Sequence, residues 1–174
     1  MPLPSFQKQR FEQAVRAYSS DLFRYLYWTC RDRAQAEDLV QETFARAWSG
    51  WEDQVDEKAV RAWLFTIARR EHARLFEKKR PEPDPEADLE ALLAPAQDPG
   101  LAIDLGRAMA SLPPLYRDPL LLQVLGGLSC AEIAAASHAT EETIHMRVSR
   151  ARKALRAWLN GDRLAGRDTQ RNPR

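Results

Sequence analysis

The stretch PEPDPEADLEALLAPAQDPGLAID, residues 81–104, decides how the chain is divided. It contains seven acidic residues and five prolines, and it has no lysine or arginine. Proline interrupts helices, and neighbouring like charges repel one another and extend the chain. The stretch therefore predicts an acidic, proline-rich linker. It separates a domain of residues 1–80 from a domain of residues 105–160, which a polar tail follows at residues 161–174.

On both sides of this linker, apolar residues recur at every third or fourth position, which is typical of helices. Helices are expected over about residues 6–30, 33–50 and 57–80 before the linker, and over about residues 101–112, 115–125, 129–136 and 140–159 after it. Asp32 and Gln35 have the spacing of a capping pair, and Ser129 and Glu132 have the spacing of a capping box. No alternating strand pattern occurs, so the predicted fold is all-α, with two small helical domains.

The composition excludes several classes of protein. The 174 residues include 26 basic and 25 acidic side chains, and the resulting net charge of +1 indicates no partner. No apolar run approaches the roughly 20 residues that span a bilayer, and the first residues lack the apolar core of a secretory signal. Cys30 and Cys130 have no neighbouring Cys or His that would complete a zinc site. We therefore expect a cytoplasmic protein with two free thiols.

The chain also lacks the residue patterns of catalysis. His72, His138 and His145 are scattered along the sequence. No glycine-rich phosphate-binding loop and no metal-ligand spacing occurs. We therefore expect neither an enzyme nor a bound metal or cofactor.

The segment that begins at Ser129 has the pattern of a helix-turn-helix. A short capped helix, a tight connection at residues 137–139 and a longer helix capped by Thr140 fit this motif. The apolar stripe of the longer helix consists of Ile144, Val148, Ala151, Leu155 and Trp158. The opposite face holds Glu142, Met146, Ser149, Arg150 and Lys153, and the flanks hold His145, Arg147 and Arg152. Short polar side chains mixed with arginines suit a helix in the DNA major groove, although a solvated basic face has the same pattern.

The third helix of the first domain forms a second basic surface. Residues 58–80 contain eight lysines and arginines against two glutamates. The aromatic residues Trp51, Trp63, Phe65 and Phe76 are interleaved with these charges. Aromatic rings can stack on unpaired bases while cations follow the phosphates, so the pattern suggests single-stranded nucleic acid. Helical spacing also suits burial of Trp63 in the core.

Two sets of motifs resemble a known family. AEDLVQETF at residues 36–44, with Ala47 and Trp48 after it, and WLFTIAR at residues 63–69 resemble region 2 of bacterial sigma-70-type factors. Region 4 of the same factors resembles four segments here: LPPLYR at 112–117, GLS at 127–129, EIA at 132–134 and RVSRAR at 147–152. Two such domains joined by a short linker resemble the extracytoplasmic-function (ECF) group of sigma factors. The resemblance extends from about Phe11 to Leu159.

This resemblance implies a dissociable specificity subunit of bacterial RNA polymerase. The first domain would bind the clamp helices of the β′ subunit and capture the melted −10 element. The second domain would hold the β flap and read the −35 duplex, while the linker would lie in the RNA-exit path. An anti-sigma factor would restrain the protein, which would stay cytoplasmic or be held at the inner membrane through that factor, without inserting into the membrane itself.

The resemblance also implies three groups of functional residues. The core polymerase-binding residues would be Asp38, Leu39, Gln41, Glu42 and Phe44 on one helix. The −10 DNA-binding residues would be Arg61, Trp63, Phe65, Arg69, Arg70 and Arg74. The −35 DNA-binding residues would be Thr140, Thr143, His145, Met146, Arg147, Ser149, Arg150 and Lys153.

The chain departs from the family pattern in the motifs that contact DNA. His138 stands where the family often has a glycine suited to a positive φ angle, and Arg70 stands where it often has an asparagine. Two alternatives remain open. A sigma-like adaptor would sequester an anti-sigma factor without binding DNA, which the retained Arg147 and Arg150 argue against. A regulator acting alone on duplex DNA would leave the first domain unexplained.

Overall fold

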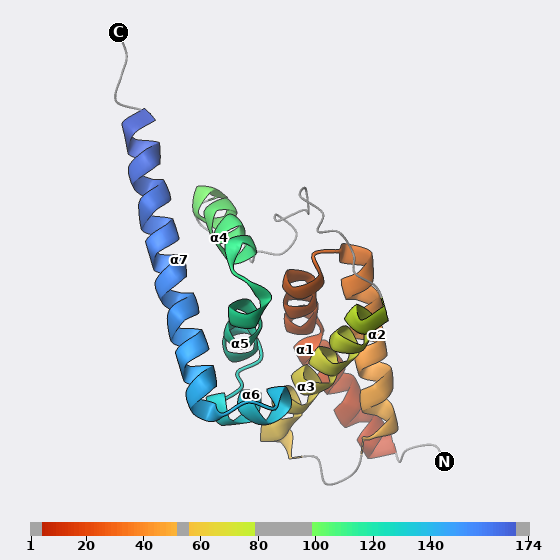
Figure 1. Cartoon of the computed structure of the whole chain (residues 1–174). Coiled ribbons are helices and arrows are strands. Elements are labelled where there is room, and N and C mark those ends of the chain that lie inside the picture. Colours follow the sequence, from red (N-terminus) through yellow and green to blue (C-terminus); the bar gives the residue numbers. More distant parts are fainter. Residues whose placement is uncertain (1–4, 52–55, 79–98, 170–174) are drawn as a thin grey trace.

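The computed structural model describes residues 5–51, 56–78 and 99–169 (Figure 1). These residues form only helices and their connections, so the all-α prediction is confirmed. The helices before the linker are α1 (Ser5–Cys30), α2 (Arg33–Ser49) and α3 (Glu57–Lys78). The helices after it are α4 (Pro99–Ser111), α5 (Pro114–Val124), α6 (Cys130–Ser137) and α7 (Glu141–Thr169).

Side-chain caps fix where three of these helices begin. The Asp32 carboxylate accepts a 2.9 Å hydrogen bond from the backbone N–H of Gln35 at the start of α2. Ser129 and Glu132 form a reciprocal capping box at the start of α6. The Thr140 hydroxyl accepts a hydrogen bond from the N–H of Thr143 at the start of α7. Each cap satisfies a backbone donor that the helix leaves unpaired, which confirms these predicted starts.

Two helices extend further than the sequence pattern indicates. Helix α4 begins at Pro99, within the stretch assigned to the linker, because proline is compatible with the first turn of a helix. Helix α7 continues to Thr169, within the stretch assigned to the polar tail. The rest of the predicted linker, residues 81–98, lies outside the described residues.

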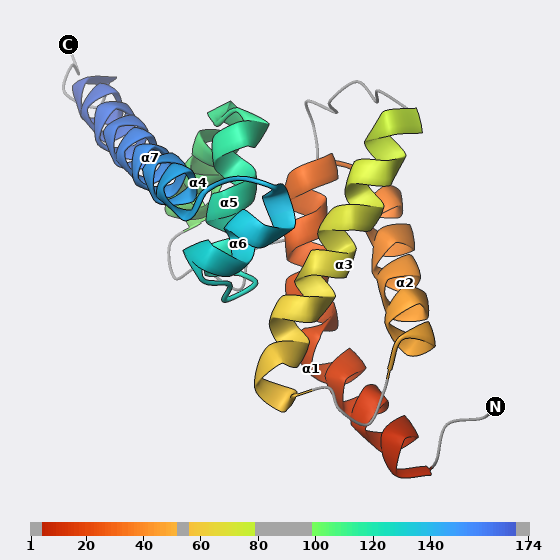
Figure 2. The same cartoon turned by 60° about the horizontal axis from the view of Figure 1, so that its bottom comes forward.

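Helices α1, α2 and α3 pack side by side around the first core (Figure 2). The largest side chains that this core buries completely are Tyr25, Phe65, Leu22, Leu26, Leu39 and Leu64. At one end of the bundle the Phe11 ring contacts the rings of Trp48 and Trp51 edge-on, at centroid distances of 4.9 and 5.0 Å. These contacts hold the end of α2 against α1.

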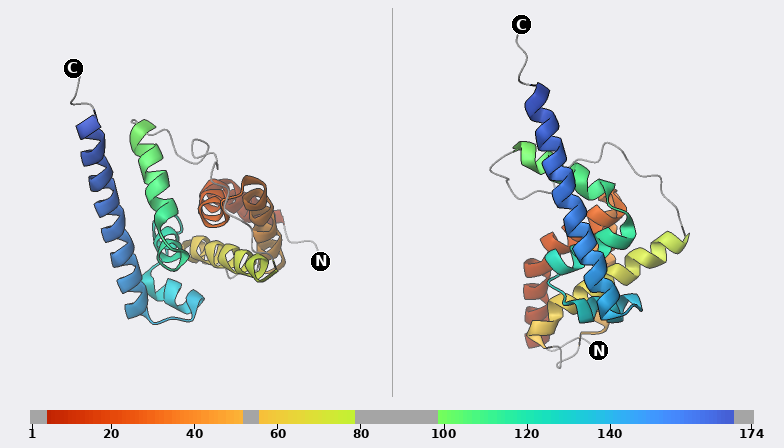
Figure 3. Two further views of the ribbon diagram at one scale, coloured as in Figure 1. Left: turned by 45° about the horizontal axis from the view of Figure 1, so that its top comes forward. Right: turned by 60° about the vertical axis from the view of Figure 1, so that its left-hand side comes forward.

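The second core lies among α4, α5, α6 and α7. Leu122, Leu128, Ile133 and Ile144 are fully buried there, which joins the two helices of the helix-turn-helix to α5. Helix α4 runs along α7 (Figure 3). Helix α7 is therefore supported along one side, and its opposite face, which includes Met146, Ser149 and Arg150, is exposed.

The two helical units pack against each other through α1 and α3 on one side and α5 and α6 on the other (Figure 2). A Cβ added to Gly126, in the α5–α6 connection, would lie 2.9 Å from Cδ1 of Phe65. The backbone of the second unit thus touches the core of the first. The cores are continuous across this interface.

The helix-turn-helix connection contains a strained residue. His138 ends α6 in the left-handed region, with φ of 52° and ψ of 38°. A side chain in this region costs about 1–2 kcal/mol, whereas glycine has no such penalty. We therefore expect His138→Gly to raise the free energy of unfolding by up to about 1 kcal/mol in urea titrations. His138→Ala, which keeps the Cβ, is the control. Equal changes in the free energy of unfolding for the two substitutions would show that the Cβ atom of His138 causes no strain.

Candidate functional site

The face of α7 that lies opposite its apolar stripe is on the surface. Ile144, Val148 and Ala151 are buried against the core and so fix the rotation of the helix. The predicted −35 residues that are exposed are Thr140, His145, Met146, Ser149, Arg150 and Lys153, and those that are half-buried are Thr143 and Arg147. The structure thus places five of the eight on the exposed surface of α7, Thr140 at its N-cap, and Thr143 and Arg147 half-buried beside them.

Two side chains of α7 are held by neighbouring elements. Arg152 donates a 2.6 Å hydrogen bond to the side-chain oxygen of Gln123 on α5. The Nδ1 atom of His145 lies 3.5 Å from the Cys130 thiol, and its Nε2 atom lies 3.5 Å from the Glu141 carboxylate. Arg150, in contrast, is exposed on the face of α7 that lies opposite the apolar stripe.

The predicted −10 residues on α3 fall into two groups. Arg70 and Arg74 are exposed, and Trp63 is half-buried beside Trp51, with ring centroids 6.0 Å apart. Arg61, Phe65 and Arg69 instead face the second unit. The structure therefore does not bring all six side chains onto one open surface.

Both arginines of the second group form hydrogen bonds across the contact with the second unit. Arg61 pairs with Asp21 of α1 at 2.9 Å and donates to the carbonyl of Leu125. Arg69 pairs through Nε with the Asp118 carboxylate at 3.0 Å and donates through Nη1 to the carbonyl of Ala136 at 2.9 Å. Each arginine thus joins α3 to the second unit.

The predicted polymerase-binding residues lie on α2. Asp38, Gln41 and Glu42 are exposed along one side of the helix, whereas Leu39 is only 1% exposed. Phe44 is half-buried and contacts the Phe11 ring edge-on at 6.1 Å. The polar residues can therefore contact a partner directly, while Leu39 and Phe44 hold the helix in place.

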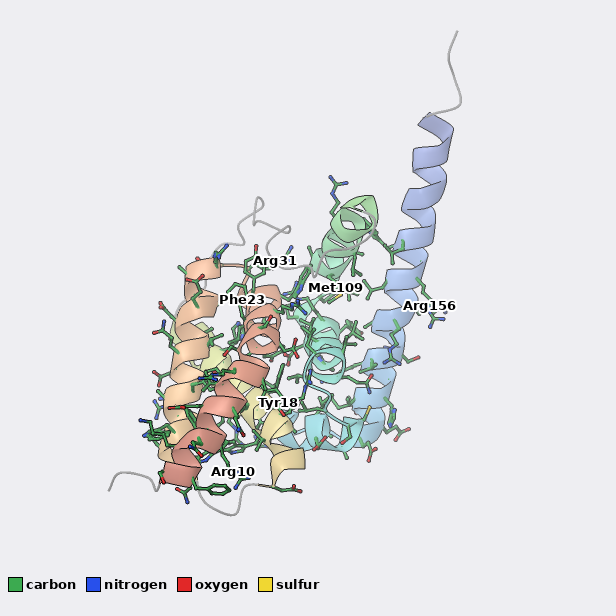
Figure 4. All side chains as sticks on the ribbon, turned by 180° about the vertical axis from the view of Figure 1, so that it is seen from behind. Arg10, Tyr18, Phe23, Arg31, Met109 and Arg156 are labelled. Carbon is green, nitrogen blue, oxygen red and sulfur yellow. The ribbon has the colours of Figure 1, made fainter. Side chains whose placement is uncertain are left out.

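A groove that the sequence did not indicate adjoins this side of α2. It has a volume of about 520 Å³ and runs between α1 and α2. Phe23 of α1, labelled in Figure 4, lines it together with Val40 and Gln41 of α2. The helical periodicity of α1 could have placed Phe23 on its α2 side, but periodicity alone does not reveal a groove.

The contact between the two units perturbs several titratable groups. Burial raises the pKa of Tyr25 well above its usual value, and the nearby Asp118 acts in the same direction. Burial lowers the pKa of Arg31 and of Arg117, and the positive charge of Arg31 lowers that of Arg117 further. The interface is therefore rich in charged groups that have lost solvent.

His72, near the end of α3, should make stability depend on pH. Burial lowers its pKa from 6.5 to about 4, and the charges of Arg117 and Arg69 assist while Asp118 opposes. Below pH 6.5 the unfolded chain then binds a proton that the folded chain does not, so the free energy of unfolding falls as the pH approaches 4. We expect a loss of about 2.5 kcal/mol over this range. Urea titrations at several pH values should show that His72→Gln reduces the dependence of the free energy of unfolding on pH. The same dependence in the wild type and in His72→Gln would show that His72 is not its source.

None of the helices described here is both long and apolar enough to cross a membrane. Within the same residues, no group of three His, Cys, Asp or Glu side chains is arranged to hold a metal ion.

Comparison with known proteins identifies the family. Residues 14–82 match the family model of sigma-70 region 2, and residues 102–155 match that of sigma-70 region 4. The ECF RNA polymerase sigma factor SigM of Bacillus subtilis is 30% identical over 155 residues, which cover 86% of this chain and 94% of SigM. The ECF sigma factor SigC of Mycobacterium tuberculosis is 34% identical over 161 residues, which cover 89% of this chain and 86% of SigC.

Solved structures of sigma factors share the fold. The sigma factor RpoE of Bartonella quintana, crystallised with the anti-sigma factor NepR, has a TM-score of 0.68 at 28% identity, over 87% of this chain and 98% of RpoE. CnrH, crystallised with the cytosolic domain of CnrY, shares the fold with a TM-score of 0.64. The region 2 model matches the first helical unit and the region 4 model matches the second. SigM and SigC match this chain along most of their own length. The chain therefore belongs to the family of ECF RNA polymerase sigma factors.

Proposed function

We propose that this sigma factor binds core RNA polymerase, recognises the −35 and −10 elements of promoters and initiates transcription of a signal-responsive set of genes. The observation that carries the proposal is the exposed recognition face of α7 in a chain that also holds a region 2 unit. The protein acts in the cytoplasm and performs no catalysis of its own.

Different parts of the chain take different roles in this proposal. Residues 1–80 bind the β′ clamp helices through α2 and the melted −10 strand through α3. Residues 105–160 read the −35 duplex through α7 and contact the β flap. Leu115 and Val124 of α5 are 52% and 62% exposed, and such apolar side chains suit the flap contact. The acidic linker, assigned to residues 81–104, follows the RNA-exit path.

An anti-sigma factor restrains the chain in the same proposal. The similar RpoE of Bartonella quintana forms a complex with the anti-sigma factor NepR, which supports a partner of this class. A membrane-bound partner of this class would hold the sigma factor at the inner membrane. No insertion of the sigma factor itself is needed.

Transcription from a library of randomised promoters tests the proposal. Purified core polymerase should give start sites with shared −35 and −10 sequences only when the chain is added. Arg70→Ala should lower permanganate reactivity of the opened strand about tenfold, because Arg70 is an exposed cation on α3. Arg16→Ala, an exposed arginine on α1, is the matched control.

The outcomes separate the candidate functions. If no transcript depends on the chain, the proposal fails and the adaptor hypothesis is favoured. If transcripts depend on the chain but Arg70→Ala leaves the permanganate reactivity unchanged, Arg70 does not contact the −10 strand. The rest of the proposal then still stands.

A further inference from the structure

A row of polar contacts in the second unit ends on the exposed side of the recognition helix. Its members come from α5, α6 and α7 and are Arg152, Gln123, Cys130, His145 and Glu141. Helix α6 packs against the beginning of α7 (Figure 1), which brings Cys130, the first residue of α6, next to the second turn of α7. The row therefore connects two positions of α7, His145 and Arg152, through side chains of two other helices.

The contact with Arg152 determines how the Gln123 amide is oriented. A guanidinium group has only donors, so the amide atom that it meets at 2.6 Å is the oxygen Oε1. The Nε2 group of the same amide then faces Cys130 and lies 3.6 Å from its Sγ atom. Because an amide nitrogen only donates, the sulfur of Cys130 is the acceptor of this hydrogen bond.

The thiol of Cys130 continues the same direction of donation toward His145. Its Sγ atom lies 3.5 Å from Nδ1 of His145, and either atom could be the donor at this distance. Since Sγ already accepts a hydrogen bond from Gln123, the S–H group is left to donate to Nδ1. Cys130 is only 6% exposed, so little water competes for its proton. This contact favours the tautomer in which Nδ1 is the acceptor.

Glu141 favours the same tautomer from the other side of the imidazole ring. Its carboxylate lies 3.5 Å from Nε2 of His145. A lone pair on Nε2 would be repelled by the carboxylate, whereas an Nε2–H group is attracted by it. The partner of one ring nitrogen decides which nitrogen carries the proton. Two separate contacts thus place the proton of the neutral ring on Nε2.

The Nε2–H group of His145 is also accessible to DNA. The side chains of His145 and Glu141 are 66% and 58% exposed. Their separation of 3.5 Å is longer than an ordinary N–H···O hydrogen bond, so the carboxylate attracts the Nε2–H group without holding it closely. An acceptor on a base can therefore take the place of the carboxylate.

We propose that Cys130 is a positioning residue for promoter recognition, which fixes His145 as an Nε2–H donor to a base in the −35 major groove. Guanine presents two acceptors in this groove, adenine and thymine present one each, and cytosine presents a donor. The base pair read by His145 should therefore favour guanine and disfavour cytosine. This inference rests on the proposed assignment of α7 to the −35 element.

Three substitutions separate this role from simple packing. Cys130→Ala removes the donor, so base discrimination at the position read by His145 should fall about fivefold, as for loss of a weak base contact. Cys130→Ser keeps a donor and should keep the preference. Gln123→Glu retains an acceptor for Arg152 but presents a carboxylate oxygen to the thiol in place of the amide N–H. The S–H group then donates to that oxygen, so Nδ1 of His145 becomes the donor to Sγ and the tautomer is inverted.

Two measurements on the full chain test the proposal. Long-range proton–nitrogen NMR correlation spectra distinguish the two tautomers of a histidine, and the signal lost in His145→Ala identifies His145. Transcription by core polymerase from promoters with a randomised −35 element measures base preference, and His145→Ala identifies the position that His145 reads. Cys30→Ser changes the other buried thiol, at the end of α1, and is the matched control.

We expect the Nε2–H tautomer in the wild type, in Cys130→Ser and in the Cys30→Ser control. Cys130→Ala should give a mixture of tautomers and Gln123→Glu the Nδ1–H tautomer, both with relaxed preference at the position read by His145. An Nδ1–H tautomer in the wild type would overturn the proposal, and so would an unaltered base preference in Cys130→Ala or His145→Ala. Failure of the proposed function differs from these results, because the wild type would then give no chain-dependent transcript while its NMR spectra would still report the tautomer.

Discussion

Reversing the charges of Asp38 and Glu42 together is expected to abolish binding to core RNA polymerase. Both carboxylates are exposed on the same side of α2, next to the groove lined by Phe23 and Val40. Positive side chains at these positions would repel the partner surface that the two carboxylates are proposed to attract. Losing charge pairs in an interface costs about 2–5 kcal/mol, so affinity should fall at least about 30-fold. Titration of labelled core polymerase measures this change.

The double variant needs a check on folding. Glu42 pairs with Arg46 one turn along α2 at 2.9 Å, and its loss removes about 0.5 kcal/mol of helix stability. Circular dichroism should therefore remain close to that of the wild type. Glu12→Arg, a reversal on the exposed surface of α1, should leave polymerase binding intact. Wild-type affinity in the double variant would disprove the role of this surface.

The second large effect is expected in promoter sequence preference. Arg150 is exposed on the recognition face, where it can bond to a base edge in the major groove. A good base contact contributes about 1–3 kcal/mol of discrimination, so Arg150→Ala should relax one −35 position by roughly 5- to 150-fold. Lys153→Ala should weaken binding to all sequences alike and reduce the salt dependence, as loss of a phosphate contact does.

A library of −35 variants, sorted by binding to each protein, distinguishes the two roles. Loss of preference at one position with Arg150→Ala, together with an unaltered profile for Lys153→Ala, is the expected pattern. The same profile for the wild type and Arg150→Ala would show that Arg150 does not read the sequence.

Local signals in the sequence were sufficient to predict the helix-turn-helix. The Ser129–Glu132 capping box, the Thr140 cap and the stripe of Ile144 and Val148 depend on neighbouring residues, and the structure shows each of them. The same signals predicted that residues opposite the stripe would be on the surface. The left-handed φ of His138 agrees with the glycine that the resembled family often has at this position, but no local signal in the sequence predicted it.

The partners of α3 could not be predicted in this way. Periodicity shows which residues share a face of a helix, but not which distant element covers that face. Arg69 and Asp118 are 49 residues apart and belong to no common motif. The sequence therefore contained no sign that Asp118 pairs with Arg69 and accepts a hydrogen bond from Tyr25.

Gly126 restricts how this sigma factor can change during evolution. A side chain at this position would meet the carbonyl oxygen of Leu122 at 2.5 Å and the Leu128 side chain at 2.6 Å, as well as Phe65. Any substitution there would distort the connection between α5 and α6 and also disturb the contact between the two units. Substitutions that alter the contact between the two units are therefore expected at side chains such as Asp118 and Tyr25, while the glycine is kept.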